Sequence, residues 1–244
     1  MKDQGLFSIN EIPEGFDLTD NQYKIYCGVK KNAPIISDNF EDLIHSVNWP
    51  VYYLDFETVK TAIPIYANVA PHTQIPTQYS IHKCSDFGKI DEHYEYIYSD
   101  PSIDCRRELA EKLINDLGKD GSIVTYSNFE ATRIKDLMKL FPDLEQELSA
   151  LIDRIVDLKK ILTDGIYHPD FHGSYSIKDT LPAIVPDMSY EGLAISKGDD
   201  ACAIFAYMVQ GKYSEEETKK KLLEYCQQDT LAMVRLHEKL RLYI

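Results

Sequence analysis

The stretch from Val51 to Thr58 mixes β-branched and aromatic residues with two acids, and this pattern predicts a strand. Successive side chains of a strand point to opposite faces, so one face begins apolar and ends in the carboxylates of Asp55 and Glu57. The two acids repel each other, and no Lys or Arg lies among them. A hard cation between their oxygens would relieve this repulsion. A strand that simply runs out into solvent at Asp55 would need no ion.

Shorter alternating stretches downstream predict further strands. Residues 78–83 and 92–98, joined across Asp86-Phe87-Gly88, would form an antiparallel three-strand meander with the first strand. Residues 122–126 predict a fourth strand. The Pro-punctuated loop over residues 62–76 is long for a structureless connection, and such loops usually bind a ligand or contribute to function.

Periodic apolar positions predict helices over most of the remaining chain. The expected helices are one opened by Asp100-Pro101, one beginning at Ser127, continuous helical sequence from about Leu144 to Leu162 with Asp157 inside it, a short one from Ser176 to near Pro186, one over Ala201–Val209, and a last one from Ser214 to the C-terminus.

Glu130 has two possible roles at the start of its predicted helix. It lies four residues before Ile134, on the same face, where it could serve as a metal ligand. Ser127-x-x-Glu130 is also a capping box, in which the Glu130 side chain would accept a hydrogen bond from the Ser127 backbone N–H. In that second role Glu130 needs no metal.

The last predicted helix carries an acid within its buried stripe. The stripe consists of Leu222, Cys226, Asp229, Met233, Leu236 and Leu240. An unpaired buried carboxylate is costly, so Asp229 is expected to have a hydrogen-bond partner, a metal or a cleft. Tyr225 lies four residues earlier, on the same side of the helix.

Composition narrows the class of protein. The chain has 244 residues, 44% of them hydrophobic and 27% charged, as in an ordinary globular protein. It has no apolar run of ~18 residues and no signal-peptide core, so neither membrane nor secretion is expected. The five cysteines form no C-x-x-C pair, which argues against a zinc site and favours reduced thiols in the cytoplasm. A net charge of −14 disfavours non-specific adhesion to nucleic acid, although metal-binding carboxylates would account for part of it.

Residues 1–48 have mixed polarity and are expected to form an N-terminal arm or linker that leads into a domain over residues 49–244. Pro13, Gly15, Gly28 and Pro34 are expected to break up any long element, with one short helix near residues 40–47.

The stretch from Tyr167 to Tyr175 predicts an irregular loop. Two histidines four residues apart, His168 and His172, could suggest a metal site, but Pro169 and Gly173 prevent the helix that would align them. Histidine and aromatic side chains on a loop suit substrate contact at least as well.

The order of these acids resembles the DEDD superfamily of 3′–5′ exonucleases, in its tyrosine-bearing subclass. Asp55-Phe56-Glu57 matches the first family motif, and Tyr225-Cys226-Gln227-Gln228-Asp229 matches the third. The second motif, around Asn128-Phe129-Glu130, normally ends in Asp and here ends in Glu. The resemblance covers roughly Val51 to the C-terminus.

Longer stretches resemble an uncharacterised bacterial branch of that superfamily. They are Tyr53-Leu54-Asp55-Phe56-Glu57-Thr58, Gln78-Tyr79-Ser80, Gly173-Ser174-Tyr175-Ser176-Ile177-Lys178 and Tyr225-Cys226-Gln227-Gln228-Asp229-Thr230. In that branch the domain often follows a RecB-like nuclease domain, which this chain lacks and which is a possible partner.

The resemblance implies an α/β, ribonuclease-H-like fold, with a five-stranded mixed sheet flanked by helices, and a site with two Mg²⁺ or Mn²⁺ ions. Asp55 would bridge the two metals, with Glu57 and Asp229 on the metal that carries the attacking water. Glu130 would hold the second metal, and Tyr225 would orient the water. Asp157 is the reserve acid if Glu130 proves only a cap. Three further residues are candidates for contacting the substrate strand: Lys178, Tyr175 and His172.

The expected function is 3′–5′ exonucleolytic cleavage at single-stranded nucleic acid ends. One alternative is a non-catalytic nucleic-acid-binding or docking module whose site has decayed at Glu130. Another is a ribonuclease-H-like endonuclease that cleaves within a duplex.

Overall fold

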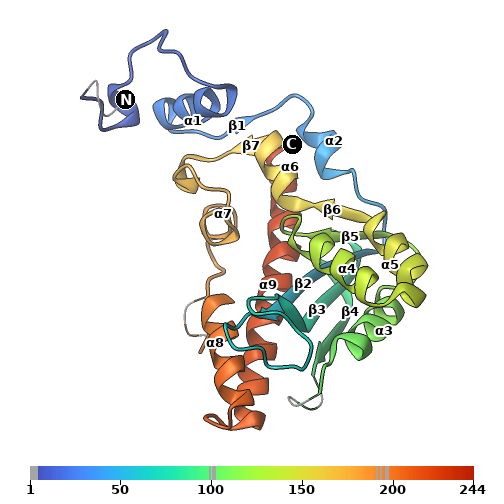
Figure 1. The fold of residues 1–244 in the computed structure, drawn as a ribbon. Coiled ribbons are helices and arrows are strands. Elements are labelled where there is room, and N and C mark those ends of the chain that lie inside the picture. The colour runs from blue at the N-terminus through green and yellow to red at the C-terminus, as the bar shows by residue number, and fades with distance from the viewer. Residues whose placement is uncertain (1–4, 99, 101–102, 191, 193, 196–197) are drawn as a thin grey trace.

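A five-stranded mixed sheet forms the centre of the computed structural model, which describes residues 5–98, 100, 103–190, 192, 194–195 and 198–244 (Figure 1). Its strands are β2 (Val51–Val59), β3 (Ile75–Asp86), β4 (Lys89–Ile97), β5 (Ser122–Thr125) and β6 (Ile155–Asp157). They lie in the order β4-β3-β2-β5-β6. The predicted meander is confirmed, because β2, β3 and β4 pair antiparallel, and β5 and β6 continue the sheet parallel to β2.

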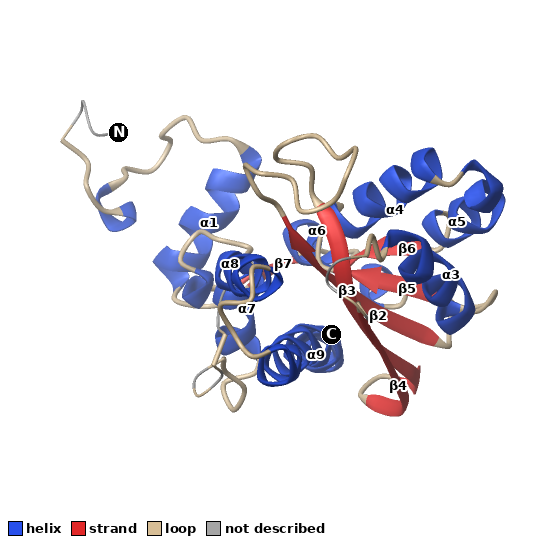
Figure 2. Cartoon of the chain, turned by 60° about the horizontal axis from the view of Figure 1, so that its bottom comes forward, coloured by secondary structure: helices blue, strands red, loops and turns tan. Residues whose placement is uncertain are grey.

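Helices cover both faces of this sheet (Figure 2). On one face lie α3 (Arg106–Leu117), α4 (Phe129–Leu140) and α5 (Glu145–Ile152). On the other lie α6 (Leu158–Gly165), α7 (Ile177–Ile184) and the long α9 (Glu215–Leu240). The helix α8 (Gly198–Val209) precedes α9, and its Phe205 packs edge-on against Tyr98. A mixed α/β architecture with a flanked five-stranded sheet is therefore confirmed.

The two cores follow the alternation along β2. Val51 and Tyr53 belong to the core beneath α9, whereas Leu54 and Phe56 belong to the core beneath α3 and α5. Asp55 and Glu57 continue the α9 face, so the strand directs its two acids toward that helix.

The segment before β2 is more structured than its composition suggested. A two-stranded sheet pairs β1 (Ile35–Ile36) with β7 (Ile166–Tyr167), and α2 (Phe40–Ile44) follows β1. The expectation that no long element forms there was wrong, because α1 (Asp20–Lys31) runs straight through Gly28. A Cβ at Gly28 would lie 2.6 Å from the Tyr167 ring, so the glycine allows close packing. Short 3-10 turns complete the fold: η2 (Ile9–Glu11), η3 (Pro142–Leu144), η4 (Pro169–Phe171) and η5 (Arg241–Tyr243).

The prediction of one continuous helix from Leu144 to Leu162 was wrong. The chain forms α5, then β6, then α6, so Asp157 ends a strand instead of lying inside a helix. Arg154 lies between α5 and β6, and its guanidinium donates to the backbone carbonyls of Gly118 and Gly121. The strand that follows supplies the fifth strand of the sheet.

Two predicted helices, α3 and α9, differ in how well their predicted starts agree with the structure. α3 begins at Arg106, later than the expected Asp100-Pro101 start, and Pro101 lies outside the described residues. The start and the buried stripe of the last helix are confirmed, since α9 begins after Ser214 and buries every residue of the predicted stripe, but the helix ends at Leu240 and not at the C-terminus. Within the described ranges, no helix combines the length and the apolar character that crossing a bilayer requires.

Candidate metal centre

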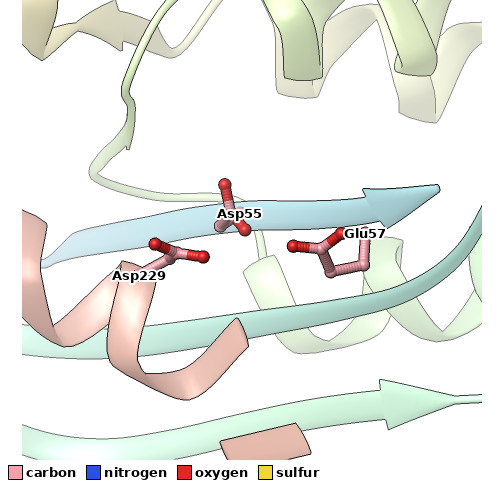
Figure 3. Close-up of side chains that lie close together, drawn as sticks. All are labelled: Asp55, Glu57 and Asp229. Carbon is pink, nitrogen blue, oxygen red and sulfur yellow. The ribbon is translucent and has the colours of Figure 1, made fainter. Parts of the chain in front are cut away.

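Three carboxylates from distant parts of the chain meet where α9 crosses β2. Asp55, Glu57 and Asp229 each offer one oxygen, and these oxygens all lie within 4.8 Å of one another (Figure 3). Figure 3 shows the two strand acids beside the acid of the helix. Asp229 is buried, at 9% exposure, and the other two are partly buried. Sheet alternation and helix periodicity therefore converge on one point.

These acids line a cleft of about 580 Å³. Six residues proposed from the sequence lie along its wall: Asp55, Glu57, Glu130, Lys178, Tyr225 and Asp229. Residues that sequence analysis did not single out also contribute, among them Lys60, Gln74, Tyr126 and Phe129.

Glu130 does not form the capping box that its sequence spacing suggested. The residue at the N-cap of α4 is Asn128, which makes no side-chain cap hydrogen bond, and Ser127 Oγ accepts from the Phe129 N–H instead. Ser127 adopts a φ of 138°, outside the helical range. Glu130 is only 3% exposed, and its Oε2 has no hydrogen-bond partner among the described residues. The capping interpretation is therefore wrong, and one oxygen of this buried carboxylate on the cleft wall is unsatisfied.

Comparison with known proteins identifies the family. Residues 52–176 match the family described as Domain of unknown function (DUF2779). The chain belongs to this family. The DUF2779 match includes Asp55, Glu57 and Glu130, and it ends before the helix that carries Tyr225 and Asp229.

The relatives of this DUF2779 chain are longer proteins. The uncharacterized protein MG366 of Mycoplasma genitalium is 26% identical over 222 residues, which cover 82% of this chain and 33% of the relative. Its homolog in Mycoplasma pneumoniae is 25% identical over 227 residues, 84% of this chain and 34% of that protein. The uncharacterized protein UU173 of Ureaplasma parvum is 28% identical over 202 residues, 73% of this chain and 27% of that protein. The chain thus spans about a third, or less, of the length of these relatives.

Burial and mutual repulsion hold protons on the acids of the DUF2779 cleft. Burial, and then the charges of Asp229, Glu130 and Glu57, raise the pKa of Asp55 well above its ordinary value. The pKa of Glu57 rises to about 8, because of burial and then the charge of Asp229. Burial and then the Asp157 charge raise the pKa of Glu130 to about 8. Without a cation, the folded protein resists full ionisation of this cluster.

The pKa of Asp229 is the least perturbed of the four acids because two hydroxyl groups and the Lys178 ammonium support its charge. Burial raises its pKa to about 6, while Tyr190, Lys178 and Tyr225 favour the ionised form. The Tyr190 hydroxyl donates to Asp229 Oδ1 at 2.6 Å, and its ring centre lies 6.4 Å from that of Tyr225. Sequence analysis missed Tyr190, because it lies in the connection between α7 and α8 and no periodic pattern marks it.

Tyr225 keeps its proton at neutral pH. Burial and then the charges of Asp229, Glu57 and Asp55 raise the pKa of its hydroxyl above the ordinary value. Its hydroxyl can therefore donate a hydrogen bond within the cleft and is a poor base. A second neighbour of the acids is Cys226, whose Sγ lies 3.7 Å from Asp55 Oδ2.

Of the three residues expected to contact substrate, the structure places only Lys178 on the cleft wall. Its Nζ lies 5.8 Å from the centre of the Tyr190 ring. Tyr175 is buried in the core beneath α9, where its hydroxyl donates to the Ile166 carbonyl. His172 is exposed after the η4 turn and does not line the cleft. The structure therefore does not bring Tyr175 or His172 to the cleft that holds the acids, and contact of either residue with a substrate stays a prediction.

Asp157, the reserve acid, has a structural task of its own. Its side chain accepts from the Lys160 N–H at 3.1 Å and caps α6. It does not line the cleft, although its charge raises the pKa of Glu130. With Glu130 on the cleft wall and not serving as a cap, Asp157 is not needed as the fourth acid.

Proposed function

We propose that this chain is a two-metal-ion 3′–5′ exonuclease of the DEDD type, built on a ribonuclease-H-like domain. The convergence of Asp55, Glu57 and Asp229 within 4.8 Å carries the proposal. Two further features support it: Glu130 and Tyr225 share the same cleft, and two of the acids, Asp55 and Glu57, stand on the central strand of a mixed five-stranded sheet. These are the residues and the fold class that the motif resemblance implies.

The donor set suits hard divalent cations. The converging groups are carboxylate oxygens, which Mg²⁺ and Mn²⁺ prefer. The unsatisfied Oε2 of buried Glu130 supports the same view, since a bound ion is one of the explanations for such an atom. Asp55, Glu57 and Asp229 would hold the ions with Glu130 completing the set. When bound, two such ions stabilise charge on both the attacking and the leaving oxygen of a phosphodiester.

The residues of the chain then have separate tasks around the scissile phosphate. Tyr190 fixes the Asp229 carboxylate through its 2.6 Å hydrogen bond. Tyr225, protonated at neutral pH, positions the attacking water through its hydroxyl. Lys178, at the start of α7, offers a cation to the anionic strand from the cleft wall. None of these tasks requires the tyrosine to act as a base.

The size of the cleft suits an end of a single strand. A volume of about 580 Å³ lies within the range of sites that enclose a small molecule. A cleft of this volume can hold one terminal nucleotide of a single strand.

An end-labelled substrate tests this function. Single-stranded DNA and RNA, 5′-labelled and carrying either a free or a blocked 3′ end, are incubated with Mn²⁺ and with EDTA. We expect a ladder shortened from the free 3′ end, dependent on Mn²⁺ and abolished by Asp55→Asn. Glu147→Gln is the matched control, because Glu147 is an exposed acid on α5 outside the cleft.

Each other outcome has a defined meaning. Equal cleavage of the blocked strand would assign an endonuclease instead. Absence of both Mn²⁺ binding and cleavage would identify a non-catalytic module.

A further inference from the structure

A second cavity adjoins the catalytic cleft on the far side of Gln74. It measures about 440 Å³, and Gln74 lines both cavities. Among the described residues on its wall, the charged ones are Arg106, Arg133, Asp136 and Lys139. We call this cavity the Arg133 pocket. Three of its four charged residues are basic, in a chain whose net charge is −14.

Arg133 connects the pocket to the candidate metal centre. It lies three residues after Glu130 on α4, so the two side chains are neighbours on the helix surface. Its guanidinium lies 5.3 Å from the centre of the Phe129 ring, which lines the cleft. Arg133 Nη1 donates to Gln74 Oε1 at 3.0 Å, which closes the wall between the two cavities. A strand that passes out of the cleft over Gln74 would therefore reach Arg133.

The donors of Arg133 are not all used. Its Nη2 lies 3.0 Å from Asp136 Oδ2, but Nε is buried without a hydrogen-bond partner among the described residues. The side chain as a whole is only 12% exposed. A guanidinium offers five N–H donors in a fork that fits phosphate oxygens. Because Nε itself is buried, a phosphate in the pocket would meet the guanidinium at its Nη groups and would reach Nε only if the side chain moves.

The other two cations differ in how far their charge is already balanced. Arg106 is held by the carboxylate of Asp104. Lys139 lies 3.5 Å from Asp136, but its side chain is 78% exposed and can move to a ligand. An anionic strand on a strongly acidic protein needs a local positive surface, and Arg133 and Lys139 together provide one beside the cleft.

We propose that the Arg133 pocket binds a backbone phosphate of the nucleic acid strand next to the phosphate that is cleaved. The inference rests on the proposed exonuclease function and deepens it: the substrate is a strand of at least three nucleotides, which the cleaved phosphate and its neighbour join, held by phosphate contacts and not by its bases. Contacts of this kind position a strand without reading its sequence.

The salt dependence of binding tests the proposal without using turnover. Affinity for a short fluorescent single strand, with phosphorothioates at its 3′ end to slow hydrolysis, is measured by anisotropy in Ca²⁺ at several salt concentrations. Each lost cation–phosphate contact lowers the slope of log K against log salt by about 0.7 for a single strand. Arg133→Gln and Lys139→Gln should each show that loss, and about fivefold weaker binding near 0.1 M salt.

Lys135→Gln is the matched control. Lys135 is an exposed cation on the same helix that does not line the pocket, so its removal should leave the slope unchanged. Lys139→Gln keeps the test valid if Arg133→Gln fails to fold, because the Lys139 side chain is mostly exposed. If the parent protein binds the strand and both pocket variants keep its slope, the pocket inference is wrong and the exonuclease proposal stands. If the parent protein does not bind a strand at all, both fall.

Discussion

Replacing Glu57 by glutamine should stabilise the metal-free protein near neutral pH. Burial and the neighbouring Asp229 raise the pKa of Glu57 from an ordinary 4.5 to about 8. Between about pH 4.5 and pH 8 the folded protein therefore holds a proton on Glu57 that the unfolded chain has released. Because of this difference, the free energy of unfolding falls as pH rises from about 4.5 through about 8. Glutamine is uncharged at every pH and nearly isosteric, so it avoids this loss.

The magnitude follows from the size of the shift. The ordinary pKa of Glu57 lies about 2.5 units below pH 7, and this difference corresponds to about 3 kcal/mol of lost stability at pH 7. At pH 5 the same linkage gives about 1 kcal/mol. With an m value of about 2–3 kcal/mol per M in urea, the variant's midpoint should rise by about 1 M at pH 7.

Urea unfolding in EDTA at pH 5 and pH 7 measures this difference directly. Glu147→Gln, an exposed acid on α5, should remain within about 0.5 kcal/mol of the parent at both pH values. Adding Mn²⁺ should remove most of this difference, because a cation at a hundredfold excess over Kd stabilises the parent by about 2.7 kcal/mol and the variant by less. The electrostatic reasoning would be refuted if Glu57→Gln were less stable than the parent in EDTA at pH 7. It would also be refuted if the stability difference between variant and parent were the same at pH 5 and pH 7.

Four other measurements test the site and its surroundings. Tyr225→Phe should leave Mn²⁺ affinity nearly intact and lower the cleavage rate by about 100- to 10,000-fold, and unchanged turnover would remove Tyr225 from the mechanism. Glu130→Asp should retain activity while Glu130→Gln loses most of it; equal activity in Glu130→Gln would show that this carboxylate holds no metal. Tyr190→Phe removes the 2.6 Å hydrogen bond to Asp229 and should weaken Mn²⁺ binding measured by calorimetry, with an unchanged Kd assigning Tyr190 to packing alone. Burial lowers the pKa of His237 to about 4, so the free energy of unfolding of the parent falls by up to about 3 kcal/mol as pH falls from about 6.5 to 4. Urea unfolding of His237→Gln should depend less on pH over that range. An equal pH dependence in the variant would show that the imidazole is charged in the folded protein.

Sequence periodicity was sufficient where an element is long or alternates strictly. The stripe of α9 placed Asp229 on the buried side of a 26-residue helix, and the alternation of β2 placed Asp55 and Glu57 on the face toward it. Both patterns repeat often enough to fix a face. The crossing of β2 by α9 depends on contacts far apart in sequence, and only the motif resemblance suggested it.

Short elements and single contacts escaped sequence reasoning for a physical reason. Three residues of β6 carry no period, and the helical pattern on either side of them extended across the gap. The start of α4 offered Ser127 and Glu130 at capping spacing, but the backbone at Ser127 turns the wrong way to use it. Tyr190 and Gln74 act through one hydrogen bond each, which no pattern of polarity records.

The same helix that places an acid in the cleft also stabilises the fold that must hold it. Cys226 and Met233 flank Asp229 on α9 and are buried, as are Leu236 and Leu240 further along. Each buried side chain of this size contributes about 1.5–3 kcal/mol, enough together to offset the repulsion that one ionised acid adds in the metal-free state. Packing on α9 therefore lets the acids stay close before a cation arrives. A bound cation relieves the repulsion between the acids, so part of its binding free energy comes from that relief. Neutralising one carboxylate should therefore raise the metal-free stability and reduce the stabilisation that the cation adds.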